Sequence, residues 1–415
     1  MSQLQALRTR PSLILGAAFV VGALLPGCTS VERREKPEVI EVSVGTQPAV
    51  PADKAAAPDL SGPHLRVLLR RGLQGLKLSA PGGLSLHDAQ DGRLLAAIGA
   101  EARGRLDAEG SQLYFGGRSL GQEVEVRADE GVLRVAGRRY AGRILLRANE
   151  GQPCLINDVG LQDYLKGVLP SEVPASWPLA ALKAQAVAAR SYAIWRAQET
   201  RKAGSSPFDL DDSVASQAYQ GREKQEARTD EAVDACNGEV LAYRDKVAQC
   251  FFHSNSGGHT AGSDEVWGGQ APAYLAGVLD SWSEDQKHYV WTTTLPLRTV
   301  EARLAKAGLW TGLLEEVVPK EETESGRWSL VRLIGSPGEK QVKAGAFRSA
   351  LGADVLRSTR FRVHRRGDDL VFDGFGWGHG VGLAQEGAKA MAEAGKDYRT
   401  ILEHYYPGTR LAKTK

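Results

Sequence analysis

Residues 178–204 read PLAALKAQAVAARSYAIWRAQETRKAG, and this stretch does most to decide the fold class. Pro178 suits the first turn of a helix, because the N–H group that proline lacks would have no helical partner there. Small and apolar side chains recur on one stripe of this helix, at Leu179, Leu182, Ala186, Ala189 and Ala193. Such a stripe lets another element pack closely. The sequence therefore predicts a long, closely packed helix over residues 178–202, with Gly204 just past its end.

Short strands are predicted on the N-terminal side of this helix, from His64 onward. Apolar or alternating runs separated by Gly, Asp and Asn lie at 65–69, 76–78, 94–95, 124–126, 133–135 and 144–146. On the other side, further helices are predicted at 229–236, 297–308 and 384–394, with a last helix ending at 406–408. A hairpin is predicted for 239–243 with 247–253, and strands for 328–334 and 360–364. Strands and helices do not alternate strictly, so the predicted class is α+β.

The composition is that of an ordinary globular protein. The 415 residues are 42% apolar and 25% charged, and 52 Lys and Arg balance 50 Asp and Glu. A nucleic-acid binder usually carries a clear basic excess, so we predict no nucleic-acid partner.

The first residues carry an export pattern. Arg8 and Arg10 precede an apolar run at 13–25. This run is too short for a membrane span of about 20 residues, but it has the layout of a signal peptide. Residues 25–28 (Leu-Pro-Gly-Cys) resemble a bacterial lipobox, which implies a lipid on Cys28 that would hold the protein on a membrane. An ordinary cleaved signal with a chance cysteine is the alternative.

Composition also suggests the domain limits. Residues 28–62, rich in Pro, Ala, Val, Lys and Glu, predict a flexible tether behind the lipidated cysteine. We then predict a signal peptide at 1–27, a β-rich part at 63–150 and a core at 151–410. For the three cysteines beyond Cys28, a Cys236–Cys250 disulfide and small buried thiols both stay open, and Cys154 would remain free.

Glu172 is the first candidate for chemistry, within Asp163 to Pro178. Pro174 keeps Val173 out of the helical region, which predicts an extended loop between a strand-like segment and the long helix. Apolar neighbours would raise the pKa of Glu172, whereas a nearby helix N-terminus would lower it. From the local pattern alone, a carboxylate that complements the dipole of the following helix is the better explanation of this residue.

Three further blocks carry polar or unusual residues. Gln185, Ala189 and Tyr192 share one helix face, which would line a sugar cleft or face solvent. His253 to Thr260, followed by Asp264-Glu265, would bind zinc through His253 and His259 or form a hydrogen-bonded turn. Residues 374–388 alternate Gly with larger residues around His379, which could titrate near neutrality. A phosphate loop is disfavoured there, because no Gly-Lys-Ser/Thr follows.

Taken in order, these blocks resemble the SpoIID/LytB family over roughly residues 65–409. The matching segments are Asp163-Tyr164-Leu165, Pro170-Ser171-Glu172-Val173-Pro174, Trp177-Pro178, 181–186, 209–210, 216–219, 253–258, 378–382, Gln385, Phe347-Arg348, Leu351-Gly352, Ser358, Phe361 and 405–408. Three positions depart from the family pattern: Val173 stands for the usual Met, Gln162 for an acidic residue and Ala384 for a Ser.

The resemblance implies a SpoIID-like mixed fold with short antiparallel strands and several helices lining a glycan cleft. It implies a lytic transglycosylase that cleaves the glycan strands of peptidoglycan, with peptide-free strands as its substrate and Glu172 as catalytic acid/base. Gln185, Arg190, Ser256, His379 and Gln385 would line the sugar cleft.

The resemblance also allows a second function, with a different protein partner. A non-catalytic, peptidoglycan-binding amidase enhancer stays the alternative, with a cell-wall amidase as its partner. Zinc is known for some relatives only, so we predict no metal or other cofactor and leave zinc at His253 and His259 open. With Thr29 after Cys28, the predicted location is the periplasmic face of the cell envelope, anchored in the outer membrane.

Overall fold

The computed structural model describes residues 39–45, 63–72, 75–79, 83–99, 101–128, 132–204, 206–213, 216–336 and 338–414. The predicted signal peptide, the lipobox cysteine and most of the predicted tether lie outside these residues. The tether prediction is wrong for strand β1 (Val39–Gly45), which pairs with β3 (Gly75–Ser79) and β11 (Val132–Val135). Ile40 and Val42 of β1 are buried, and their alternation with Glu41 is the period-two pattern of a half-buried strand.

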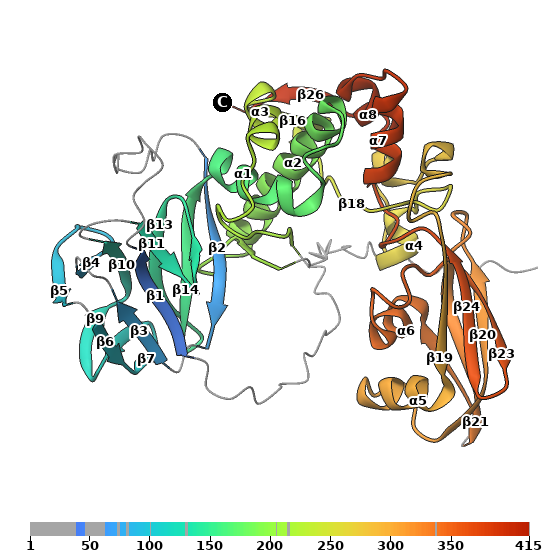
Figure 1. The fold of residues 1–415 in the computed structure, drawn as a ribbon, viewed down its shortest axis with the longest axis horizontal. Coiled ribbons are helices and arrows are strands. Elements are labelled where there is room, and N and C mark those ends of the chain that lie inside the picture. Colours follow the sequence, from blue (N-terminus) through green and yellow to red (C-terminus); the bar gives the residue numbers. More distant parts are fainter. Residues whose placement is uncertain are drawn as a thin grey trace, which may run out of the picture. The chain divides into compact units, whose positions relative to one another are not determined.

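The N-terminal strands form three sheets. The largest has the order β15-β2-β14-β13-β10-β4-β5, and the others have the orders β12-β11-β1-β3-β6 and β7-β8-β9 (Figure 1). The bounds are β2 (His64–Arg71), β4 (Leu84–Asp88), β5 (Leu94–Ile98), β6 (Glu101–Gly104), β7 (Leu106–Glu109), β8 (Gln112–Phe115), β9 (Arg118–Gly121), β10 (Glu123–Ala128), β12 (Arg138–Arg139), β13 (Arg143–Asn149), β14 (Gln152–Gly160) and β15 (Leu210–Asp211).

The predicted domain boundary at 150/151 is wrong, because it falls in the turn of a hairpin. β13 and β14 pair antiparallel from Arg143↔Asp158 to Asn149↔Gln152. Glu150 and Gly151 make the turn with φ of 51° and 73°. The turn residues that suggested a boundary therefore join two central strands of one sheet.

Helices cluster around α2 (Leu179–Ala203), which confirms the long helix predicted from the sequence. Its contacts include α1 (Leu161–Glu172), α3 (Ala227–Ala235), α7 (Gln385–Glu393) and α8 (Tyr398–Tyr405), drawn in green to red in Figure 1. Gly204 ends α2 with a left-handed φ of 73°. Strands β16 (Glu239–Tyr243), β17 (Lys246–Val247) and β26 (Arg410–Lys413) form a small sheet beside it. Cys154, Cys236 and Cys250 are buried free thiols, so the disulfide alternative is wrong.

Residues 290–375 form a second hydrophobic core, so the region predicted as one core holds two. Two three-stranded sheets, β19-β24-β23 and β20-β21-β22, pack with two helices there. The bounds are β19 (Val290–Pro296), α5 (Leu297–Lys306), β20 (Leu313–Glu322), β21 (Trp328–Ser336), β22 (Gly338–Lys343), α6 (Ala344–Leu351), β23 (Phe361–Arg366) and β24 (Asp369–Phe375).

Short elements connect the two cores: β18 (Phe252–His253), β25 (Leu383–Ala384), α4 (Ser263–Trp267) and the 3-10 turns Ala273–Leu275 and Ser281–Ser283. β18 pairs parallel with β25, which joins the 253–258 block to the start of α7. The predicted α+β class is confirmed. None of the helices in the described ranges combines the length and the apolar character that crossing a membrane requires.

Candidate functional site

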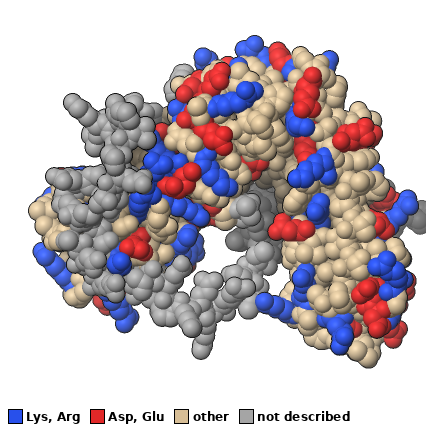
Figure 2. Space-filling model, viewed as in Figure 1, with Lys and Arg blue, Asp and Glu red and all other residues tan. Residues whose placement is uncertain are grey.

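A cavity of about 540 Å³ brings together several of the sequence blocks. It is lined from α1, α2, β18, α4, α6 and the segment that leads into α7. The lining residues are Glu172, Tyr192, Ser216, Phe251, Phe252, His253, Ser254, Trp267, Arg348, Trp377, Gly378, His379 and Gln385. Outside the cavity, Figure 2 shows Lys and Arg side chains interspersed with Asp and Glu, in line with the nearly balanced net charge.

Glu172 is the last residue of α1, not a loop residue as predicted. Val173 caps the helix in an extended conformation, with φ of −138°, as expected before Pro174. The Glu172 Oε1 atom accepts a hydrogen bond of 2.8 Å from the Ala218 N–H group.

The pKa of Glu172 is raised, chiefly by burial. Hydrogen bonds from the Ala218 backbone and the Gln385 side chain lower the pKa but do not outweigh burial. The sequence could not decide between these influences. The nearer helix end is the C-terminus of α1, whose partial negative charge also disfavours a carboxylate.

Gln385 and His379 line the cavity as predicted. Gln385 is the first residue of α7, which places its amide beside Glu172. The His379 Nδ1 atom accepts the Val381 N–H group at 3.0 Å. Burial, together with the charges of Arg348 and Arg327, lowers the pKa of His379 to about 3. His379 is therefore neutral in the folded protein, and the expectation that it titrates near neutrality is wrong.

Arg190 does not line the cavity. It is fully buried and joins α2 to α3 and β16. Its guanidinium donates to the carbonyl oxygens of Glu239 (3.0 Å) and Val233 (3.2 Å) and to Gln162 Oε1 (3.0 Å). Arg190 therefore connects helices and a strand within the core and does not line the cavity, contrary to the prediction that it contacts the sugar.

Gln185 and Ser256 are also core residues and not cavity residues. Gln185 is 1% exposed on α2 and Ser256 is fully buried. The Ser256 Oγ atom accepts the Gly258 N–H group at 3.0 Å, and its carbonyl oxygen accepts from Arg327 at 2.7 Å. Ser256 thus shapes the turn that follows β18.

The sequence reasoning missed the aromatic wall of the cavity. Trp267, at the end of α4, is 40% exposed and packs against Phe251, with ring centroids 4.4 Å apart, and against His379, at 5.3 Å. Trp377 lies edge-on to His288 at 4.6 Å. In the sequence, the signal at this position was Trp267 followed directly by the double glycine 268–269.

The zinc alternative finds no support in the placement of its candidate ligands. His253 Nδ1 donates to the Val381 carbonyl oxygen at 3.1 Å, and burial sets the pKa of His253 well below its ordinary value. His259 Nδ1 lies 2.6 Å from the Thr260 carbonyl oxygen, and Glu265 accepts from Ser325 at 2.5 Å. Within the ranges that the structure describes, no three His, Cys, Asp or Glu residues group to hold a metal ion.

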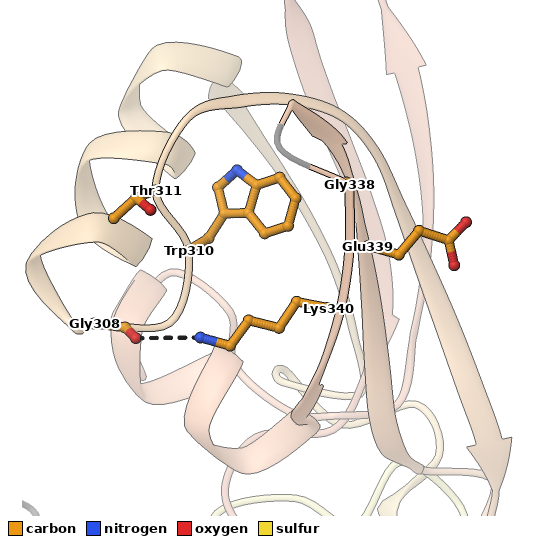
Figure 3. A pocket seen from close by; sticks show the side chains of 6 residues that line it. All are labelled: Gly308, Trp310, Thr311, Gly338, Glu339 and Lys340. Atoms are coloured by element: carbon orange, nitrogen blue, oxygen red, sulfur yellow. Dashed lines mark hydrogen bonds between the residues drawn. The ribbon is translucent and has the colours of Figure 1, made fainter.

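A second, smaller cavity of about 210 Å³ lies in the second core (Figure 3). Its lining includes Trp310 and Lys340, and the Lys340 ammonium donates to the Gly308 carbonyl oxygen at 3.5 Å. None of its lining residues belongs to the four sequence blocks that contain the candidate functional residues. The larger cavity is therefore the candidate site.

The fold and the cavity define an α+β protein with one buried acid in an aromatic-lined site. Residues 149–243 match the family model described as stage II sporulation protein, and residues 280–382 match a domain of unknown function (DUF8618). Stage II sporulation protein D of Bacillus amyloliquefaciens is 30% identical over 274 residues, which is 62% of this chain and 76% of that protein.

Two further relatives extend the match. An uncharacterized protein of Brachyspira hyodysenteriae is 32% identical over 66% of this chain and 72% of its own length. The amidase enhancer of Bacillus subtilis is 29% identical over 74% of this chain, but the match spans only 48% of that protein, about half of it. The chain belongs to the SpoIID family.

Proposed function

We propose that this protein has a cell-wall role and cleaves the glycan strands of peptidoglycan as a lytic transglycosylase, with Glu172 as its acid and base. One observation carries the proposal. Glu172 is the one carboxyl group among the described residues that line the main cavity, and burial raises its pKa. A carboxyl group that keeps its proton is suited to general acid catalysis near neutral pH.

The chemistry needs a single carboxyl group. Glu172 donates its proton to the glycosidic oxygen as the bond from that oxygen to C1 of the muramyl residue breaks. The resulting carboxylate then takes the proton of the muramyl 6-hydroxyl, whose oxygen bonds to C1. The product is a 1,6-anhydromuramyl end, and no water is consumed. A hydrolytic glycosidase would instead use two carboxyl groups across the bond.

The surroundings of Glu172 support both steps. The Ala218 N–H group and the Gln385 amide stabilise the carboxylate formed after the first proton transfer. Trp267 and Phe251 offer apolar faces against which a sugar ring can pack.

An amidase-enhancing function is the second candidate, because the Bacillus subtilis relative bears that name. In that case the cavity would bind glycan without cleaving it, and Glu172 would be a binding residue. The two functions differ in one measurable property, which is the appearance of new strand ends.

The experiment is product analysis by mass spectrometry. Full-length protein in detergent would be incubated with peptide-free and intact glycan strands, beside Glu172→Gln and, as a matched control, Glu231→Gln on the exposed face of α3. Anhydromuramyl ends from wild type and the control, but not from Glu172→Gln, are expected. Reducing ends would indicate a hydrolase. Binding without cleavage by wild type would favour the amidase-enhancer function.

We further propose export and anchoring through a lipid on Cys28, at the periplasmic face of the envelope. The lipobox-like residues 25–28 support this. Cys28→Ser should abolish incorporation of labelled palmitate and release the protein from the membrane fraction. A Cys28→Ser protein that stays in that fraction would contradict the proposal.

A further inference from the structure

Arg348 is the one Lys or Arg among the described residues that line the main cavity. It lies on α6, in the second core, whereas Glu172 ends α1 in the first. In the sequence, Arg348 belongs to the Phe347-Arg348 segment that resembles the family.

The guanidinium of Arg348 is anchored along one edge. Its Nε atom donates to the Leu356 carbonyl oxygen at 2.9 Å, and its Nη2 atom to the Ala353 carbonyl oxygen at 3.4 Å. Among the described residues, the hydrogen bonds of the Arg348 guanidinium are these two, from Nε and Nη2, and none is made by Nη1. The Nη1 atom of this fixed, planar guanidinium group is therefore available to donate to a ligand.

The rest of the cavity does not neutralise this charge. Burial raises the pKa of Glu172 and lowers the pKa values of His253 and His379, which favours the uncharged form of all three. Asp354 is the carboxylate whose charge acts on Arg348, and it does not line the cavity. A half-buried cation whose Nη1 atom has no protein partner favours an anion, and a carboxylate matches the geometry of a guanidinium group best.

Peptide-free glycan carries such a carboxylate. Each muramic acid has a lactyl group whose carboxyl is free in a peptide-free strand and becomes an amide when a stem peptide is attached. Resting on the proposed function, we infer that Arg348 binds the lactyl carboxylate of peptide-free muramic acid and makes the site specific for strands without stem peptides. An amide at this position would lack the charge and would place a peptide in the cavity.

The test measures binding, so it does not depend on catalysis. Muramic-acid oligosaccharides with a free lactyl carboxylate, the same oligosaccharides as methylamides, and N-acetylglucosamine oligosaccharides would be titrated calorimetrically into full-length Glu172→Gln protein. Arg348→Gln and Arg348→Lys would be added in that background. Arg362→Gln, an exposed arginine on β23 of the same core, is the matched control.

We expect the parent to bind the free carboxylate at least about tenfold more tightly than the methylamide, the usual scale of one charge-assisted pair. Arg348→Gln should abolish this preference, Arg348→Lys should keep part of it, and Arg362→Gln should keep all of it. Binding of N-acetylglucosamine oligosaccharides should be unchanged, which also shows that the variants are folded.

Equal affinity of the parent for free carboxylate and methylamide, or an unchanged preference in Arg348→Gln, would overturn the inference. Cleavage by wild-type protein would still be seen in that case if the proposed function is right. Conversely, a charge preference that depends on Arg348 in a protein that never cleaves would support the inference and refute the transglycosylase.

Discussion

Replacing Arg190 with methionine tests whether this arginine has a structural role or a substrate-binding role. In the structure the guanidinium lies among α2, α3 and β16 and holds three oxygen acceptors. Methionine fills a similar length without donors, so the apolar packing of the stem is largely kept. The loss of stability then comes mainly from the oxygen acceptors that no longer receive a hydrogen bond from residue 190.

The magnitude follows from those acceptors. The Glu239 carbonyl group loses its Arg190 donor at 3.0 Å. The Val233 carbonyl group loses the Arg190 donor at 3.2 Å but keeps Gln162 Nε2 at 3.4 Å and Cys236 Sγ at 3.7 Å. One buried acceptor left without a partner costs about 1–3 kcal/mol, and removing an arginine that was costly to dehydrate offsets part of this. We expect Arg190→Met to lower the free energy of unfolding by about 2 kcal/mol.

The assay is urea unfolding followed by the helical circular dichroism signal, with Arg196→Met as control. Arg196 is exposed on the same helix, so its replacement should change stability by less than about 0.5 kcal/mol. At low temperature, folded Arg190→Met should bind glycan as wild type does. A variant of wild-type stability that has lost glycan binding would show that Arg190 meets the substrate, and our assignment would be wrong.

Three further predictions concern the cavity. Trp267→Ala should weaken glycan binding by about tenfold in calorimetric titration, because a half-exposed stacking face is lost, and leave the unfolding midpoint nearly unchanged; unchanged affinity would exclude the aromatic wall as a sugar surface. Gln385→Leu removes a bond that lowers the pKa of Glu172, so that pKa should rise further and the alkaline limb of the cleavage pH profile should move to higher pH; a shift to lower pH would contradict this reading. The pKa of His379 falls from 6.5 in the unfolded chain to about 3, so its contribution to stability is complete above about pH 6.5 and is lost as pH falls toward 3; thermal unfolding should show a shallower loss in acid for His379→Gln, and an identical slope would refute it.

The fold class and the helix at 178–202 could be predicted because local chemistry sets them. A proline at the start, a small-residue stripe and a glycine at the end act over a few residues. The boundary at 150/151 could not be placed, since a turn inside a sheet and a turn between domains use the same residues. The strand at 39–45 has a correct alternating pattern that lies within a Pro- and Ala-rich stretch, and the composition of that stretch concealed it.

The site was predictable only in part. Glu172 comes from one block and His379 and Gln385 come from another, and the three residues meet in one cavity. The two motifs do not indicate which of their side chains are buried. Gln185 and Arg190 share α2 with Tyr192, yet the helix turns them into the core while Tyr192 reaches the cavity. Burial raises the pKa of Glu172, and hydrogen bonds from Ala218 and Gln385, which are 46 and 213 residues away, lower it in part, so no local pattern contains the outcome.

The second core is built as an insertion, and this explains why it can complete the site. Its first and last strands, β19 and β24, pair antiparallel, with Val290 opposite Phe375. The chain therefore enters and leaves this core at neighbouring points, and the first core resumes at Val381. The insertion carries Arg348 of α6 to the cavity, and Trp377 follows shortly after β24, its last strand, which ends at Phe375. Under this arrangement, the helix that carries Glu172 and the helix that carries Arg348 belong to different hydrophobic cores, so a substitution that repacks α6 need not disturb the packing around α1.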